Sequence, residues 1–140
     1  MGSLGIYVHV PFCVKKCNYC DFLSFPLKRE TDCSEVENYV NALRKEICNP
    51  FKMPESPAEV DTIYLGGGTP SLLSGRQIGT ILETIRRKFS VKPDAEITME
   101  CNPGTVTAES LCAYRDLGIN RLSIGIQSAV EKELSLLGRI

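Results

Sequence analysis

Hydrophobic residues along the chain follow two alternating patterns, short β-rich runs and longer segments with helical spacing. The β-rich runs are residues 4–10, 60–65, 95–101 and 120–128. Helical spacing of apolar residues is found at 34–48, after Ser74 and near 107–117, and a fourth helix begins at "EKELSLLGRI". Strands that alternate with helices of this length predict βαβ units, and therefore an α/β fold with a parallel sheet.

Capping residues mark where several of these elements begin and end. Ser74 is an N-cap candidate, and Gln77 three residues later completes a capping box. The helix that follows has one apolar face, made by Ile78, Ile81, Leu82, Ile85 and Phe89. Gly118 is predicted to end the third helix, and residues 51–59, with two prolines, are predicted to form a surface connection.

The unusual loops of the sequence all follow the carboxyl end of a predicted strand. They are the cysteine loop after residue 10, "GGGTP", "ECNPGT" and "IQS". In barrels and open α/β sheets this edge binds ligands, so the sequence predicts a ligand site there. The strands themselves show little polar alternation, as in "TIYL" and "LSIGI", which is typical of strands buried on both faces.

Four strands are too few to close a barrel, and the last predicted helix has barely begun at Ile140. We therefore interpret residues 1–140 as the N-terminal part of a core domain, with the rest of the barrel and a C-terminal domain absent from this chain. An apolar flank is expected to be exposed where later strands would pair. We also expect the truncated chain to be poorly soluble.

Composition excludes several classes of protein. The 16 basic and 17 acidic residues give a formal net charge of -1, which offers no broad attraction to nucleic acid or an anionic membrane. No apolar run approaches the roughly 20 residues of a membrane helix. The start, "MGSLGIYVHVPFC", has no basic region or cleavage site typical of a signal peptide. We therefore expect a cytoplasmic protein in a reducing environment.

The seven cysteines are an odd number, which a closed disulfide framework cannot use up. Three of them lie in one loop with the spacing C-x3-C-x2-C and are candidate metal ligands: Cys13, Cys17 and Cys20. The other four are scattered through predicted helices and strands and are interpreted as small buried apolar residues: Cys33, Cys48, Cys101 and Cys112.

Three clustered thiols leave three interpretations open. A structural zinc site usually has four protein ligands; the sequence has no second C-x2-C pair, although a cysteine from another loop could complete the site. A cubane iron–sulfur cluster held by three thiolates leaves one iron open for an exogenous ligand, which indicates chemistry rather than plain electron transfer. Chance clustering is the third interpretation, and the ready oxidation of exposed thiols counts against it.

The triple glycine at 66–68 directly follows the second predicted strand. A phosphate-binding P-loop would require G-x4-G-K-[ST], and no lysine follows here. Glycines let a ligand approach the backbone closely. A tight turn between a strand and a helix would use the same residues, so both interpretations remain open.

Other polar residues near strand ends also have two interpretations. Glu100 could accept hydrogen bonds from ribose hydroxyls, Gln127 could bind a ligand through its amide, and Arg139 could bind a carboxylate. Each could equally be a surface or structural residue. Arg121 is explained as a solvated charge or the partner of a nearby acid, and His9 as a hydrogen-bonded structural residue.

Together the motifs resemble a known superfamily. C-x3-C-x2-C after a first strand and G-G-G-T-P after a second resemble the radical S-adenosylmethionine (SAM) enzymes. "YVHVPFC", "ECNPGT" and "NRLSIGIQS" make the sequence most similar to the oxygen-independent coproporphyrinogen III oxidase-like family. The resemblance implies the N-terminal portion, about four βα units, of a partial TIM-type (β/α)6 barrel with parallel strands. It also implies a [4Fe–4S] cluster, with SAM on the fourth iron.

The resemblance carries residue roles over by motif. The cluster would be ligated by Cys13, Cys17 and Cys20. The cluster-bound SAM would be contacted by Tyr7, Gly67 and Glu100. Further contacts to SAM or another ligand, matched to the porphyrinogen oxidases, would come from Tyr19, Gly68, Thr69, Gln127 and Arg139. No catalytic residue is assigned.

Phe22 distinguishes two branches of this family. The porphyrinogen oxidases tend to read C-x3-C-x2-C-x-C, whereas this sequence has Phe22 at the place of the last cysteine. "CDF" and "NPGT" instead resemble the heme chaperone branch, often called HemW, which implies a protein that binds heme and passes it to acceptors. The other signature of that branch, H-N-x-x-Y-W, would lie beyond Ile140.

The leading hypothesis is therefore a radical SAM heme chaperone. Its expected partners are a heme or porphyrinogen ligand, a heme-acceptor protein and an electron donor, without nucleic acid and without a transmembrane segment. The alternative is an oxygen-independent coproporphyrinogen III oxidase, which converts its substrate to protoporphyrinogen IX by oxidative decarboxylation. A second alternative is a zinc or iron–sulfur binding module without SAM chemistry.

Overall fold

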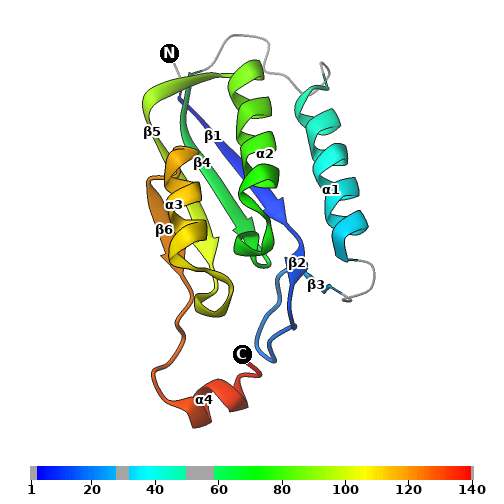
Figure 1. Ribbon diagram of the computed structural model, residues 1–140, viewed down its shortest axis with the longest axis vertical. Coiled ribbons are helices and arrows are strands. Elements are labelled where there is room, and N and C mark those ends of the chain that lie inside the picture. Colours follow the sequence, from blue (N-terminus) through cyan, green and yellow to red (C-terminus); the bar gives the residue numbers. More distant parts are fainter. Residues whose placement is uncertain (1–2, 28–31, 50–58, 140) are drawn as a thin grey trace.

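A four-stranded parallel sheet forms the centre of the computed structural model, which describes residues 3–27, 32–49 and 59–139. The strands lie in the order β1 (Ser3–Val10), β4 (Glu59–Gly67), β5 (Ser90–Cys101) and β6 (Arg121–Ile124). All neighbours pair in parallel, which confirms the predicted α/β class (Figure 1). A short parallel pair, β2 (Phe12–Cys13) with β3 (Phe25–Pro26), lies beyond the end of β1.

Three helices cover one face of this sheet, one in each connection between successive strands (Figure 1). They are α1 (Asp32–Ile47), α2 (Gly75–Lys88) and α3 (Ala108–Asp116), and a short α4 (Glu131–Leu136) follows β6. The predicted capping box is confirmed, since the Gln77 amide donates to Ser74 Oγ and the Ser74 amide donates to Gln77 Oε1. Gly118 ends α3 as predicted, with its amide bonded to the Arg115 carbonyl.

The core lies between these helices and the sheet face that they cover. The apolar face of α2 is buried as its spacing predicted, through Ile78, Ile81, Leu82 and Ile85. The predicted burial of both sheet faces is wrong for the two runs that suggested it, on β4 and β6, although residues 97–99 at the centre of β5 are all buried. On β4, Thr62 and Tyr64 alternate with the buried Ile63 and Leu65 and stay exposed or half-buried. The sheet therefore keeps a partly polar, open face, and this face leads to the site.

Truncation of a core side chain on α2 should be costly. Leu82 is fully buried, so Leu82→Ala is expected to lower the free energy of unfolding by about 2–5 kcal/mol through lost contacts and a residual cavity. Urea unfolding followed by circular dichroism measures the change. The matched control is Glu83→Ala, which removes only an exposed pair with Arg87 and should change stability by less than about 0.5 kcal/mol. Equal losses for the two variants would contradict this view of the core.

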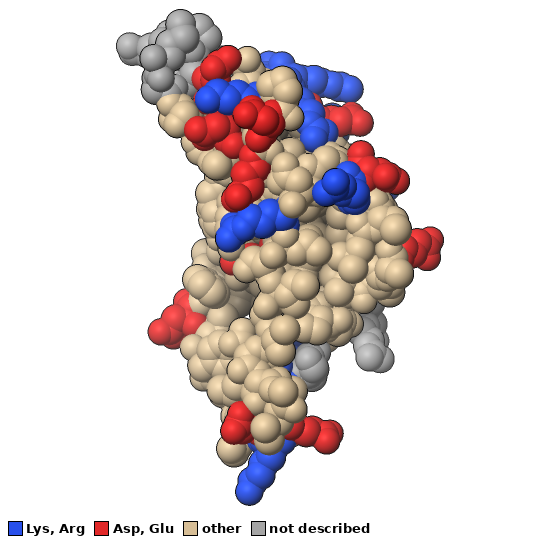
Figure 2. Space-filling model, turned by 90° about the vertical axis from the view of Figure 1, so that its left-hand side faces the viewer, with Lys and Arg blue, Asp and Glu red and all other residues tan. Residues whose placement is uncertain are grey.

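The β6 edge of the sheet carries exposed apolar side chains. β6 pairs only with β5 among the described strands, and Leu122, Ile124 and Ile126 are 38%, 47% and 61% exposed. Figure 2 views the molecule from this side, and uncharged residues cover most of its lower half. The predicted exposed flank is thus confirmed, while poor solubility stays a prediction.

Several predictions require correction. β6 ends at Ile124 rather than at residue 128, because the chain leaves the ladder and Gln127 adopts a left-handed φ of 65°. Cys48 and Cys112 are exposed rather than buried, since Cys48 follows the end of α1 and Cys112 lies opposite Tyr114 on α3. Cys101 is buried as predicted.

Two further predictions concern residues that lie outside the described part of the chain. The side chain of Cys33 lies outside it, as does the surface connection predicted at 51–59, apart from Glu59 at the start of β4. Among the described residues, no helix is both long and apolar enough to cross a membrane.

Candidate cofactor site

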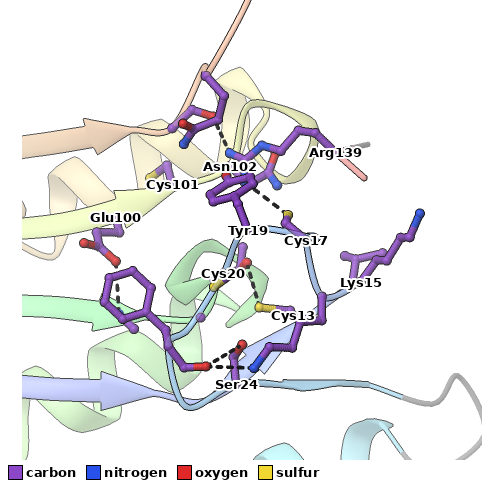
Figure 3. A pocket seen from close by; sticks show the side chains of 18 of the residues that line it. Cys13, Lys15, Cys17, Tyr19, Cys20, Ser24, Glu100, Cys101, Asn102 and Arg139 are labelled. Carbon is purple, nitrogen blue, oxygen red and sulfur yellow. Dashed lines mark hydrogen bonds between the residues drawn. The ribbon is translucent and has the colours of Figure 1, made fainter. Parts of the chain in front are cut away.

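The predicted ligand edge contains a cavity of about 220 Å³ at the carboxyl ends of the strands (Figure 3). Its walls come from the cysteine loop, the triple glycine, the end of β5 and the segment after β6. Of the residues predicted for the site, all but Tyr7 line it: Cys13, Cys17, Tyr19, Cys20, Gly67, Gly68, Thr69, Glu100, Gln127 and Arg139. Parallel strands bring these distant segments together because their carboxyl ends share one edge.

The cysteine loop is closed at its base by the β2–β3 pair. The Phe25 amide donates to the Pro11 carbonyl over 2.7 Å, and the Leu27 amide donates to the Cys13 carbonyl over 2.8 Å. The loop that connects these two strands, together with the end of β2, places Cys13, Cys17 and Cys20 around the same cavity (Figure 3). Cys13 is buried and the other two are half-buried, so all three sulfurs are shielded from bulk solvent on at least one side.

The triple glycine and the following Thr69 form backbone hydrogen bonds to the segment that leads into Cys13. The Gly68 amide donates to the Val10 carbonyl, and the Thr69 amide donates to the Phe12 carbonyl, both over 2.7 Å. The Thr69 hydroxyl lies 3.6 Å from Cys13 Sγ. The glycine loop is therefore both a tight connection and a wall of the cavity, and its role in ligand binding stays a prediction.

Glu100 is held by two donors on the open face of the sheet. The Tyr64 hydroxyl donates to Oε1 over 2.8 Å, and the Gly67 amide donates to Oε2 over 3.0 Å. Burial, and then the hydrogen bond to Glu100, raise the pKa of Tyr64, so this hydroxyl keeps its proton at neutral pH. A carboxylate has about four acceptor positions. Two therefore remain for a ligand hydroxyl or amine in the cavity.

Tyr7 lies outside this cavity and lines a groove between β1 and α1. Its ring stacks on Tyr64, with centroids 6.0 Å apart, and its hydroxyl lies 3.1 Å from His9 Nδ1. His9 Nε2 lies 2.7 Å from the Leu23 carbonyl. A carbonyl can only accept, so Nε2 carries the proton and, in a neutral imidazole, Nδ1 accepts from Tyr7. This confirms His9 as a hydrogen-bonded structural residue, and it connects β1 to the cysteine loop.

Arg139 reaches the cavity from the turn after α4. Its Nη1 lies 3.9 Å from Cys17 Sγ, and its Nη2 donates to the Gly125 carbonyl (Figure 3). Its position beside a sulfur distinguishes it from Arg121, which pairs with Glu96 over 3.3 Å as the sequence suggested. Arg139 is thus a cationic group directed at the cysteine loop.

The donor set of the cavity fits an iron–sulfur cluster. Thiolates are soft ligands that suit zinc or iron–sulfur centres. Within the described ranges, no three His, Cys, Asp or Glu side chains converge to hold a single metal ion. A cluster does not require such convergence, because each thiolate binds a different iron. The three cysteines and the glycine wall of the cavity are therefore compatible with a cluster and a ligand beside it.

A parallel sheet with three loop cysteines, a glycine wall and a carboxylate around one cavity at its carboxyl edge is typical of an α/β domain that binds a cofactor at this edge. The model of the radical SAM superfamily matches residues 7–140, so the chain belongs to this superfamily. The superfamily implies a [4Fe–4S] cluster and SAM as cofactors.

Curated and solved relatives agree with this assignment. The chain is 47% identical over 140 residues to heme chaperone HemW of Escherichia coli (strain K12), matching 100% of this chain and 36% of that protein. It is 36% identical over 135 residues to heme chaperone HemW of Bacillus subtilis (strain 168), matching 96% and 34%. The structure of coproporphyrinogen III oxidase (HemN) from Escherichia coli, a radical SAM enzyme, superposes with a TM-score of 0.87 at 31% identity, over 97% of this chain and 30% of that one.

The chain spans about a third of the length of these relatives. The similarities confirm the predicted family resemblance and the predicted radical SAM fold class. These similarities concern only the third of each relative that matches this chain.

Two residues that hold parts of the site in place, Tyr64 and Asn18, were not singled out from the sequence. Tyr64 could have been found, because it alternates with the buried Ile63 and Leu65 and therefore faces the open side of the sheet, where it donates to Glu100. Asn18 had no such signal, since its hydrogen-bond partners are the carbonyls of Leu136 and Leu137, more than a hundred residues away.

Proposed function

We propose that Cys13, Cys17 and Cys20 ligate three irons of a [4Fe–4S] cluster and that the fourth iron is left for SAM. The observation that supports this proposal is that three thiols of one loop line one cavity together with the glycine wall and Glu100. When bound, the cluster supplies the electron for reductive cleavage of SAM. The contribution of the chain is to hold the thiolates, shield them and orient the second cofactor.

The proposed SAM contacts are Gly67 and Glu100 in the cavity wall, together with Tyr7, which lies outside the cavity but stacks on Tyr64 beside Glu100. Glu100 retains acceptor positions beyond those used by Tyr64 and Gly67, so it can accept from the hydroxyls of a ribose. Further contacts to SAM or to a second ligand are proposed for the other predicted residues of the cavity wall, Tyr19, Gly68, Thr69, Gln127 and Arg139.

We further propose that the complete protein binds heme and transfers it to an acceptor protein, with a one-electron donor as a second partner. The identity of 47% over the whole chain to a protein named heme chaperone HemW carries this proposal. Phe22 supports it, because this position, 61% exposed at the rim of the cavity, carries an aromatic ring instead of a fourth loop cysteine.

Heme binding and turnover can be tested on the full-length protein after anaerobic reconstitution with iron and sulfide. We expect a saturable heme spectrum upon titration. We also expect no protoporphyrinogen IX when reduced protein is incubated with SAM and coproporphyrinogen III. Formation of protoporphyrinogen IX at a catalytic rate would overturn the chaperone proposal in favour of an oxidase. One zinc per chain without cluster absorbance would overturn both the chaperone proposal and the oxidase alternative.

The hydroxyl of Tyr64 should matter for SAM affinity. Tyr64→Phe keeps the ring that stacks on Tyr7 but removes the donor to Glu100. The carboxylate is then held by the Gly67 amide alone, and a loss of about 1 kcal/mol weakens SAM binding roughly fivefold. Equilibrium dialysis with labelled SAM measures the effect. Tyr114→Phe is the matched control, because the Tyr114 hydroxyl is buried and donates to the Leu73 carbonyl away from the cavity; equal losses of SAM affinity would contradict the role of Tyr64.

A further inference from the structure

The short helix α4 ends against the cysteine loop, although 118 positions separate the contacting residues in the sequence (Figure 1). The backbone amide of Asn18 donates to the Leu137 carbonyl over 3.0 Å. The side-chain amide of the same residue donates to the Leu136 carbonyl, also over 3.0 Å. One residue between two candidate iron ligands thus makes two hydrogen bonds to the end of one helix.

The turn after α4 leaves these two carbonyls available. The Arg139 amide donates to the Leu134 carbonyl over 2.9 Å and the Gly138 amide to the Ser135 carbonyl over 3.1 Å, which is the bonding of a Schellman turn. The next carbonyls have no partner within the helix. Gly138 adopts a φ of 67°, and a Cβ there would lie only 2.9 Å from Asn18 Oδ1. The glycine therefore permits both the turn and the close approach of Asn18.

The same turn directs Arg139 back toward the loop. Its guanidinium lies between Cys17 Sγ and the Gly125 carbonyl (Figure 3). It thereby connects the cysteine loop to the segment that follows β6. Asn18 directly follows Cys17 in the sequence, and the Arg139 guanidinium lies beside the Cys17 sulfur in space, so both contacts bear on the position of Cys17.

We propose that Asn18, Gly138 and Arg139 form a latch that holds Cys17 in a ligand-ready position and that Arg139 raises the reduction potential of the cluster. Asn18 and Arg139 are positioning residues in this proposal, which rests on the proposed cluster site. The latch also joins two walls of the cavity, because Arg139 contacts both Cys17 of the cysteine loop and Gly125 after β6.

Hydrogen bonding explains the effect on the potential. Reduction adds negative charge to the cluster and its sulfur ligands, and hydrogen bonds to those sulfurs favour the reduced form. A guanidinium keeps its charge at all relevant pH values and forms strong hydrogen bonds to anionic acceptors. Arg139 beside Cys17 Sγ should therefore stabilise the reduced state more than the oxidised state.

The latch itself is tested first on metal-free full-length protein by hydrogen exchange. Asn18→Ala removes the bond to Leu136 and should increase exchange about five- to tenfold in two separate segments, 14–24 and 131–139. Asn41→Ala, on the exposed side of α1, is the matched control and should change neither segment. Faster exchange in the cysteine loop alone would overturn the latch. This readout needs no cluster, so it is independent of the proposed function.

The effect on the cluster is tested by spectroelectrochemistry of reconstituted protein without SAM. Arg139→Gln should shift the midpoint potential to more negative values, and Arg139→Lys, which keeps the charge, should restore part of the shift. Asn18→Ala should speed the removal of iron by a chelator about five- to tenfold. An unchanged potential in Arg139→Gln, measured on protein with full iron content, would overturn the role of Arg139. Absence of a cluster in the unaltered protein would instead overturn the proposed cofactor site.

Discussion

Replacing Cys17 or Cys20 by serine is expected to remove the cluster from anaerobically reconstituted protein. Iron should fall from about four per chain to below about one, because a serine hydroxyl is a poor ligand and two remaining thiolates hold a cluster weakly. Iron and sulfide analysis together with visible absorbance measures the loss. The matched controls are Cys48→Ser and Cys112→Ser, which alter exposed cysteines outside the cavity and should retain full iron content. Full iron content in Cys17→Ser would contradict the ligand assignment.

Cys101 also lines the cavity and is therefore a candidate fourth ligand that the same experiment can test. A fourth cysteine ligand would close the iron that we assign to SAM. Its side chain belongs to the apolar core, and burial raises its pKa to about 11. The thiol is therefore protonated at neutral pH when no metal is bound. Since it packs in the core outside the cysteine loop, we do not assign it as a ligand. Cys101→Ser should retain the cluster, and loss of iron in this variant would show that the site has four protein ligands and no open iron.

Local signals were sufficient to predict the elements and most of the site. The capping box of Ser74 and Gln77 fixed the start of α2, and its apolar spacing identified the buried face. Because parallel strands end at one edge, their order alone predicted that the cysteine loop, the glycine loop and Glu100 would meet. No knowledge of side-chain positions was needed for this step.

The errors arose where local pattern does not determine the environment. A short apolar run is compatible with burial on one face or on two, so the open face of β4 was missed even though Tyr64 alternates with buried neighbours. After β6 the chain turns through Gln127, which adopts a left-handed backbone conformation. This conformation is uncommon for residues other than glycine, so nothing in the sequence indicated it. The contact of Asn18 with α4 depends on the three-dimensional path of the chain, and sequence spacing carries no information about it.

Adding a single methyl group at Gly68 should disrupt both cofactor sites. A Cβ there would lie 2.5 Å from the Phe12 carbonyl oxygen and 3.0 Å from the Val10 carbonyl oxygen. Both are backbone atoms of the segment leading to Cys13, and the glycine loop is hydrogen-bonded to the same carbonyls. The clash cannot be relieved by a side-chain rotation, so the loop and the segment must move apart.

Gly68→Ala is therefore expected to cost about 1–3 kcal/mol at this contact, which corresponds to roughly 5- to 150-fold weaker SAM binding, together with partial loss of iron. Equilibrium dialysis with SAM and iron analysis on the same samples separate the two effects. Gly75→Ala is the control, because its Cβ would meet Ala113 Cβ at an ordinary 3.5 Å and alanine favours the helix by up to about 1 kcal/mol. If Gly68→Ala bound SAM and iron as well as Gly75→Ala, the close approach of the glycine loop to the segment before Cys13 could not be required for either cofactor site.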